Sequence, residues 1–441
     1  MLKDFNLKRN QLGSEGGKAL ANALCKNSTL KGLNLNSNWI GSEGANAHCK
    51  NSTLTSLNLE SNILGSEGGK ALADALYKNS TLTSLNLAFN NLEFEEGKAL
   101  ADALYKNSTL TSLNLAFNNL VSEGGKVLAR WKALVSALHV NNTLTSLNLE
   151  SNKLGSEGGK TLRRNNSKCT LQEHQTYFLG SSFERTWIKR RKSNGRCTLQ
   201  NYFTSLTSLD LYDNKLGSEG GKALSDALCK NSTLASLNLQ KNELKSEGGK
   251  ALADVLYALC KNFTLTSLNL ENNNLGSEGR KALADALCKN STLTSLDLAF
   301  NNLGSEGGKA LTDALCKNST LTSLILASNN LQSEEGKALA DAICKNSTLK
   351  NLNLYWNNLG SEGGKALADA LCKNSTLTSL DIAFNNFGSE GGKAFTDALY
   401  KNSTLISLNL ASNNLQSEEG EALANALCKN STQKKFESLF E

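Results

Sequence analysis

The chain has 441 residues, 20% of them charged, and a formal net charge of +6. No apolar run approaches the roughly 18 residues that a membrane span needs, and the first residues do not resemble a secretory signal. We therefore expect a cytoplasmic protein with no membrane partner. The charge does not indicate a nucleic-acid-binding face, because residues 163–203 alone carry nine Lys or Arg against two Glu, a net +7, and the rest of the chain sums to −1.

One leucine pattern recurs with a period near 28 residues. It reads Leu-x-x-Leu-x-Leu-x-x-Asn-x-Leu, and a period of this length is typical of a solenoid, in which each unit contacts mainly its neighbours. Fourteen units begin at Leu2, Leu30, Leu54, Leu82, Leu110, Leu144, Leu206, Leu234, Leu265, Leu293, Leu321, Leu349, Leu377 and Leu405.

The unit 293–320 shows what each repeat is expected to form. Leu296 and Leu298 alternate with the polar Asp297, which predicts a short strand with one buried face. Asn301 follows where the strand must turn, and its amide can bond to backbone groups of its own coil and the next. Ser305 is predicted to cap a helix that continues to about Cys316. The apolar stripe of that helix is Leu311, Ala314 and Leu315.

The curvature of the array follows from two different spacings. Strands stack about 4.8 Å apart, whereas packed helices need about 8–10 Å. The predicted fold class is therefore α/β, a horseshoe-shaped solenoid with an inner parallel sheet and outer helices.

Residues 163–203 lose the leucine pattern and interrupt the array. We therefore divide the chain into units 1–6 at 1–162, an irregular basic insert at 163–203, and units 7–14 of the same solenoid at 204–441. The insert is expected to form an irregular bulge that interrupts the stack. It is either a genuine insert or repeat DNA translated out of frame, because Cys-Thr-Leu-Gln occurs twice in it, 28 residues apart. A nuclear-import or nucleic-acid patch at 189–192 is the weaker alternative.

Three recurring motifs have a structural interpretation that outweighs the chemical one. Residues 155–161 end in Gly-Lys-Thr like a phosphate-binding loop but are one residue short. Nine of the eleven cysteines occupy one slot near a helix end, too far apart for disulfides, and the three histidines are scattered, so no metal site is predicted. The repeated Asn-Ser-Thr matches a glycosylation acceptor, but its position between helix and strand favours a structural role.

The units differ mainly at two positions after each strand. By alternation from the buried leucines, the first position points outward from the sheet and the second lies at its rim. Aromatic side chains here suit a contact surface, although rings that tuck beneath the loop and stack on one another would explain them equally well. The predicted partner-binding residues are Phe89, Phe117, Tyr212, Glu271, Phe300, Tyr355, Trp356 and Phe384.

The strand pattern and the following Leu-Gly-x-x-Gly-x-x-Ala-Leu-x-x-Ala-Leu resemble the ribonuclease-inhibitor type of leucine-rich repeat. The resemblance covers nearly everything outside 163–203 and implies a right-handed horseshoe that acts in protein recognition. Members include ribonuclease inhibitors, the Ran GTPase-activating protein and the sensor arrays of nucleotide-binding immune receptors. The sequence differs from those receptors in having no nucleotide-binding domain, and from the ribonuclease inhibitors in having far fewer cysteines.

We therefore predict a non-catalytic scaffold that binds a protein partner through its concave face, with no cofactor, metal or nucleic acid. No recurring acid, amide or hydroxyl breaks the pattern beside a candidate base, so no catalytic residue is predicted. The alternative is a regulator of a small GTPase, although no unit matches the functional residues of the GTPase activator. Polar caps are weak at both ends of the array, which also predicts self-association through the end units.

Overall fold

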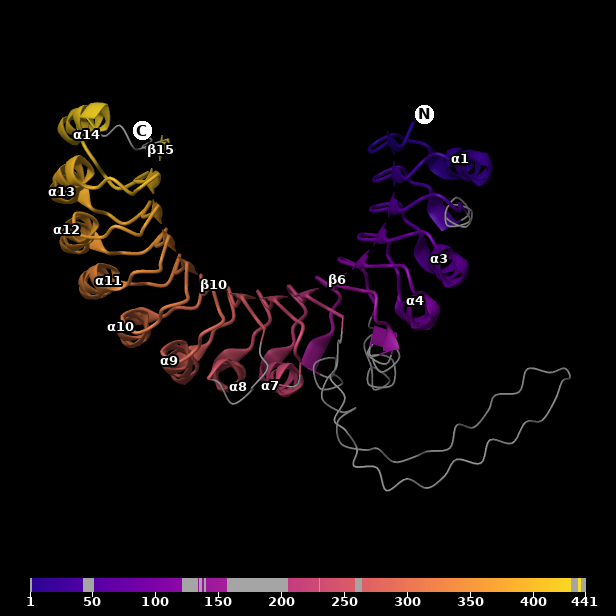
Figure 1. Cartoon of the computed structure of the whole chain (residues 1–441), viewed down its shortest axis with the longest axis horizontal. Helices are drawn as coiled ribbons and strands as arrows, with labels where there is room; N and C mark the ends of the chain where they lie inside the picture. The colour runs from indigo at the N-terminus through magenta and orange to yellow at the C-terminus, as the bar shows by residue number, and fades with distance from the viewer. Residues whose placement is uncertain are drawn as a thin grey trace, which may run out of the picture.

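The leucine repeat folds into an open horseshoe with one sheet on its inner side and helices on its outer side (Figure 1). This computed structural model describes residues 2–42, 51–120, 134, 137–138, 140–156, 205–229, 231–257, 264–429 and 435–437. The basic insert 163–203 and the three histidines lie outside the described residues. The predicted solenoid, with its sheet on the inside of the bend, is confirmed.

The inner sheet has fifteen parallel strands in chain order within the described residues. Each strand is three residues long, and in β2 to β14 its central leucine is buried in the core, as the leucine alternation predicts, whereas the central Phe5 of the first strand is exposed. Neighbouring strands pair in exact repeat register, so that Leu296 lies beside Leu324. The strands are Asp4–Asn6 (β1), Gly32–Asn34 (β2), Ser56–Asn58 (β3), Ser84–Asn86 (β4), Ser112–Asn114 (β5), Ser146–Asn148 (β6), Ser208–Asp210 (β7), Ser236–Asn238 (β8), Ser267–Asn269 (β9), Ser295–Asp297 (β10), Ser323–Ile325 (β11), Asn351–Asn353 (β12), Ser379–Asp381 (β13), Ser407–Asn409 (β14) and Lys435–Glu437 (β15).

Eleven helices cover the outer side in the described part of the chain. Their Leu and Ala stripes pack against the leucines of the strands and form one continuous core along the array. None of them is long and apolar enough to cross a membrane. They are Gly13–Lys26 (α1), Gly65–Lys78 (α3), Phe94–Lys106 (α4), Gly217–Leu228 (α7), Lys245–Leu256 (α8), Gly276–Leu287 (α9), Gly304–Leu315 (α10), Ser333–Lys345 (α11), Gly360–Leu371 (α12), Gly388–Lys401 (α13) and Ser417–Lys429 (α14).

A buried row of asparagines joins the loops that follow the strands. The side-chain amide of Asn329 donates to the carbonyl of Leu298 in the preceding unit (2.9 Å), and its Oδ1 accepts from the backbone N–H of Asn301 (3.0 Å) and Leu303 (3.2 Å). The same contacts recur in most of the described units, which confirms the predicted bonds within and between coils, although Oδ1 of Asn38 and of Asn152 accepts no bond. Each loop is therefore held by the next one, because these buried polar groups have no access to water.

A second asparagine row explains the repeated Asn-Ser-Thr. Asn318 is buried where α10 ends; its amide donates to the carbonyl of Leu287 (2.8 Å), and its Oδ1 accepts from the N–H groups of Thr320 (3.1 Å) and Leu321 (2.8 Å). The amide nitrogen to which a glycan would be attached is thus engaged inside the protein. The structural interpretation of this motif is confirmed at Asn290, Asn318, Asn346, Asn374 and Asn402.

The predicted Ser cap is wrong. Helix α10 begins at Gly304, after Leu303 in a helical conformation, and has no side-chain cap. Ser305 lies in the first turn and donates its hydroxyl to Glu335 Oε1 of the next unit (2.7 Å). The left-handed conformation of Gly304 starts the helix instead, because glycine adopts a positive φ without a Cβ clash.

The expectation that the insert interrupts the stack is wrong for the sheet. Strand β6 pairs directly with β7, and Leu147 lies beside Leu209 in the repeat register. The hydrogen-bonded ladder therefore passes from unit 6 to unit 7 without a gap, although more than forty residues of sequence separate them. The buried asparagine row also continues, because Asn152 donates its backbone N–H to Asn214 Oδ1 (3.1 Å).

Candidate protein-binding face

The inner face of the sheet carries the positions at which the units differ. The first variable residue after each strand lies on this face. Most of the alanines here are buried, whereas Tyr212, Glu271 and Tyr355 are half-buried. The second variable residue is held at a positive φ in all fourteen units, from Arg9 to Ser412. Because the fold imposes this conformation on every residue type, the side chains at this position are oriented alike at the end of the sheet.

The aromatic residues at the second position are exposed rather than tucked beneath the loop. Phe89, Phe117, Phe300, Trp356 and Phe384 are between 38% and 59% exposed. Their backbones are fixed by the next coil: the N–H of Phe300, for example, donates to the carbonyl of Ala327 (3.0 Å). The rings therefore present apolar surface to solvent at predetermined positions.

Rings in adjacent units nevertheless contact one another. Phe89 and Phe117 stack with their ring centroids 4.1 Å apart and their planes 10° from parallel. Stacking and exposure thus coexist at this end of the sheet, because each ring covers one face of its neighbour and leaves the other side in solvent. The stacking that the sequence offered as one interpretation is therefore observed for this pair, and the role of the rings as a contact surface stays a prediction.

A three-ring cluster follows β12 and β13. Tyr355 lies edge-on to Trp356 (centroids 6.1 Å apart) and to Phe384 (5.2 Å), and Trp356 and Phe384 are 6.4 Å apart. Trp356 is the most exposed large apolar side chain in the described part of the chain, at 59%. Because the rings support one another, their conformations are restricted before any partner arrives, which reduces the entropy lost on binding.

The centre of the face is polar. Lys241 Nζ donates to the hydroxyl of Tyr212 (2.6 Å) and lies 5.0 Å from the centroid of its ring. The hydrogen bond to Tyr212 raises the pKa of Lys241, and burial, with the charge of Asp297 adding to it, raises the pKa of Glu271. Burial likewise raises the pKa of Asp297 itself. Carboxylates with raised pKa values favour a partner that brings positive charge to this part of the face.

A further carboxylate lies on the N-terminal side of this centre. The pKa of Glu150 is raised, and burial is the largest cause. The charges of Asp210 and Asp213 in the next unit add to the effect. The sequence prediction included Glu271 but missed Glu150, Asp210, Lys241 and Asp297. The signal that could have found them is the inner-face position of each residue in its unit, which the leucine pattern determines.

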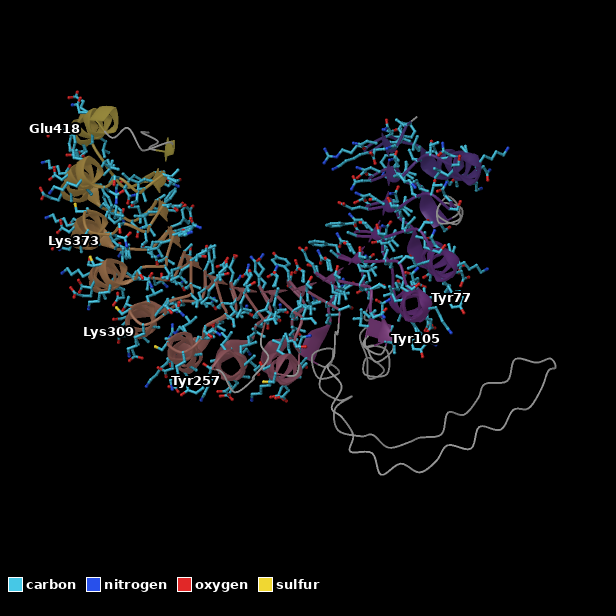
Figure 2. The ribbon with its side chains drawn as sticks, in the orientation of Figure 1. Tyr77, Tyr105, Tyr257, Lys309, Lys373 and Glu418 are labelled. Carbon is cyan, nitrogen blue, oxygen red and sulfur yellow. The ribbon has the colours of Figure 1, made fainter. Side chains whose placement is uncertain are left out.

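The outer face differs sharply from the inner one. Lys222 bridges Glu219 (3.5 Å) of its own helix and Glu247 (3.2 Å) of the next, and Lys365 is placed in the same way between Glu362 and Glu390. Figure 2 shows the labelled side chains, among them Tyr77, Tyr105 and Tyr257, projecting from the helical side. Exposed charge pairs of this kind contribute little stability and keep the outer surface balanced in charge.

The remaining candidate sites gain no support from the geometry. Within the described residues, no group of three or more His, Cys, Asp or Glu is placed to hold a metal ion. Cysteines near the helix ends are free thiols: Cys316 and Cys344 are exposed, whereas Cys288 and Cys372 are partly buried against the core. Only the first two residues of the phosphate-loop-like segment 155–161 are described, so that motif lies largely outside the structure.

Structures of several repeat proteins are similar to this chain. A leucine-rich-repeat protein of Legionella pneumophila, LegL7, is 26% identical, with a TM-score of 0.40, over 69% of this chain and 83% of its own. A chain of the yeast complex of Rad7 and Elc1 is 17% identical, with a TM-score of 0.39, over 85% of this chain and 84% of its own. Actin-binding site 2 of leiomodin-1 is 20% identical, with a TM-score of 0.29, over 42% of this chain and 88% of its own. A comparison with curated protein sequences gives no match.

The sequence profile described as "Leucine Rich repeat" matches the chain fourteen times. The matches cover residues 1–21, 26–47, 50–73, 78–101, 106–129, 140–162, 204–225, 230–253, 261–284, 289–311, 317–340, 345–368, 373–395 and 401–424. They include every unit found from the leucine pattern, and the parallel sheet with outer helices is the architecture that such repeats form. This chain belongs to the leucine-rich-repeat family, and its units are of the ribonuclease-inhibitor type.

Proposed function

We propose that this protein is a non-catalytic scaffold that binds a protein partner through the inner face of the horseshoe. The observation that carries the proposal is the exposed three-ring cluster of Tyr355, Trp356 and Phe384 at the end of a rigid sheet. Large aromatic side chains on a preformed surface are typical anchors of protein interfaces. Phe89, Phe117, Phe300, Tyr212 and Glu271 extend the same face toward the N-terminus.

The shape of the molecule supports the same assignment. A sheet that lines the inside of a bend can contact a convex partner along many units at once, so that individually weak contacts add. The outer face has its charges paired between helices, as at Lys222 and Lys365. The inner face instead combines exposed rings with carboxylates of raised pKa. A positively charged group of a partner would stabilise the ionised form of these carboxylates more than it would stabilise charges that are already paired.

The test replaces the rings with a residue that the fold already accepts at the same position. Ser328 and Ser412 occupy the slot of Trp356 and Phe384 at the same positive φ, so Trp356→Ser with Phe384→Ser leaves the backbone conformation unchanged. Proteins captured from cell lysate by the wild type and lost with the double variant are candidate partners. Loss of about 30-fold or more in affinity for such a partner is expected, since two aromatic anchors are removed.

The matched control changes the outer face. Tyr77→Ser with Tyr105→Ser removes two exposed rings from the helical side, and it should leave the captured partner and its affinity unchanged. If the inner-face variant retains full affinity for every captured protein, or if it loses binding only because it unfolds at lower temperature, the proposal is wrong.

Regulation of a small GTPase is a narrower version of the same proposal. It would use the same face but would also accelerate GTP hydrolysis in the partner. Its only support is the resemblance to the Ran GTPase-activating protein, since no residue of that activity has a counterpart in these units. A GTP-turnover assay on any captured GTPase separates the two versions: faster hydrolysis requires the regulator, and binding without acceleration excludes it.

A further inference from the structure

Two apolar side chains in the second and third units break the pattern of the loops. Trp39 and Ile63 occupy the position directly after the buried asparagine of each loop, and both are 58% exposed. In most other units this position holds Asn, and in the remainder Gln, Lys or Glu. An exposed tryptophan beside an exposed isoleucine therefore replaces two polar residues on the loop surface.

The backbone makes these substitutions costly. Trp39 has a φ of 55° and Ile63 a φ of 55°, in the left-handed region that Asn tolerates and that a β-branched residue such as Ile strongly disfavours. Folding gains little in return, because most of each side chain stays in water. Strain and exposure together indicate that these residues serve something other than the stability of the array.

Backbone hydrogen bonds fix the two loops against each other. The N–H of Asn38 donates to Asn62 Oδ1 (3.1 Å), and the N–H of Gly41 donates to the carbonyl of Asn62 (3.0 Å). These bonds bracket Trp39 and place it at the same height as Ile63 in neighbouring loops. Phe89 and Phe117 follow on the next two loops, at the same end of the strands, but directly before the buried asparagine rather than directly after it. The four residues form the N-terminal rim.

Positive charge lies beside the first end of the N-terminal rim. Lys8 and Arg9 follow β1 in the loop of the first unit and are exposed, and the N–H of Arg9 donates to the carbonyl of Asn36 in the unit of Trp39 (2.8 Å). Lys3 and Lys31 are exposed at the other end of β1 and β2, and Asp4 is the acid among them. Glu60 follows β3, on the side of Trp39 away from Arg9.

We propose that the N-terminal rim binds an amphipathic helix of a partner protein, with acidic residues at the end of that helix nearest Lys8 and Arg9. The inference deepens the proposed function by naming the chemistry of the partner at this part of the face. The apolar stripe of the helix covers Trp39, Ile63, Phe89 and Phe117. The acidic end neutralises the exposed Lys8 and Arg9, which otherwise repel each other.

The spacing of the loops fits such a helix. Successive loops stack about 4.8 Å apart, which places the four rim residues at about 0, 4.8, 9.6 and 14.4 Å along the array. A helix rises about 1.5 Å per residue, so side chains at i, i+3, i+7 and i+10 lie at about 0, 4.5, 10.5 and 15 Å on one face. A helix lying along the array can therefore place one apolar residue over each rim residue.

The experiment uses three fluorescent synthetic helical peptides and the full-length protein. All three peptides carry leucine at i, i+3, i+7 and i+10. They differ only in the residues at the end that is expected to lie nearest Lys8 and Arg9, which are glutamate in the first peptide, glutamine in the second and lysine in the third. The glutamate peptide is expected to bind at least tenfold more tightly than the lysine peptide, and Lys8→Glu with Arg9→Glu should reverse the preference. Trp39→Asn with Ile63→Asn should weaken the glutamate peptide by about 30-fold or more.

Stability separates binding from folding in the same variants. Because Asn tolerates the left-handed conformation, Trp39→Asn with Ile63→Asn should unfold at the same temperature as the wild type or a higher one. Trp356→Ser with Phe384→Ser should leave binding of the peptide unchanged, so this inference and the proposed inner-face site can fail separately. No binding of the glutamate peptide, equal binding of all three, or a lower unfolding temperature for the Asn variant would overturn the proposal.

Discussion

Asn301 and Phe300 are adjacent in the chain and represent two rows of residues with opposite behaviour. The row of Asn301 is asparagine in unit after unit and is buried from Asn38 onward, and Asn301 itself bonds to the coil before and the coil after. The row of Phe300 is exposed and varies among aromatic, charged and small polar residues, while its backbone keeps one positive φ throughout.

The difference shows which contacts specify the fold. A buried amide that both donates and accepts cannot change in one unit without leaving groups unsatisfied in two others. An outward side chain on a backbone that its neighbours already hold can change freely. The variable residues of the exposed row are therefore the ones expected to determine which partner binds. The constant asparagines of the buried row hold the stacked units together.

The largest expected effect comes from the buried row. Asn329→Ala removes the donor to the carbonyl of Leu298 and the acceptor of two backbone N–H groups. The free energy of unfolding should therefore fall by about 3–5 kcal/mol. Urea denaturation followed by circular dichroism measures it. Asn330→Lys, at the next position and with Lys153 and Lys215 as precedents for its positive φ, should stay within about 0.5 kcal/mol. Equal effects at the two positions would refute the distinction between the rows.

A close approach between units gives the next largest effect. A Cβ on Gly308 would lie 2.7 Å from Cγ of Glu335 and 2.9 Å from Cδ2 of Leu331, so Gly308→Ala should destabilise by about 1–3 kcal/mol. Adding Glu335→Gly should recover part of that loss in a double-mutant cycle. A Cβ on Gly304 would have no atom within 4 Å, so Gly304→Ala tests the strain of a positive φ alone. Zero coupling between Gly308 and Glu335 would contradict the packing.

The stacked rings should contribute less. Phe117→Ser removes a ring 4.1 Å from that of Phe89, and we expect a loss of about 1 kcal/mol. Phe300→Ser is the control, since Phe300 has no ring neighbour in the described part of the chain and is 46% exposed. Thermal unfolding of both variants compares them. If Phe300→Ser loses well above about 1 kcal/mol of stability, the exposed row stabilises the array and does not serve only to bind a partner.

The smallest effect concerns charge on the inner face. Because burial raises the pKa of Asp297, its ionised form is less favourable in the folded state than in the unfolded one. The free energy of unfolding therefore falls as pH rises from the ordinary carboxyl pKa through the raised pKa of the folded state. At lower pH the carboxyl is protonated in both states, so it causes no loss of stability. Asp297→Asn keeps the bond to the N–H of Ala299, as Asn86 does with Ala88, and should gain about 0.5 kcal/mol or less at pH 7.

A reverse variant sharpens this test. Asn269→Asp places a new carboxylate beside Asp297 in the sheet register, near Glu271. It should lower stability at neutral pH and have no effect in acid. Unfolding measured between pH 3 and 8 for both variants checks the sign. A gain for Asp297→Asn that persists at the acid end would mean that charge is not its cause.

Much of the site was predictable only in outline. The leucine pattern places Phe300 and Trp356 at the end of the sheet, and that placement is correct. Whether such rings are hidden or exposed depends on the neighbouring loops: Ala299 is buried, but the ring of Phe300 after it is exposed. The sequence did not single out Trp39, because its unfavourable conformation becomes evident only when its φ and its exposure are known together.

The sequence by itself determined the repeat, the inner sheet and the bend, because a leucine at fixed spacing has one buried position and strands stack more closely than helices. Only the tertiary structure decided how the helices begin, since Ser305 bonds to the next unit rather than capping its own helix. The three-dimensional arrangement also decided that β6 and β7 pair despite the insert between them. Both outcomes depend on contacts between units, and a pattern read within one unit contains no information about them.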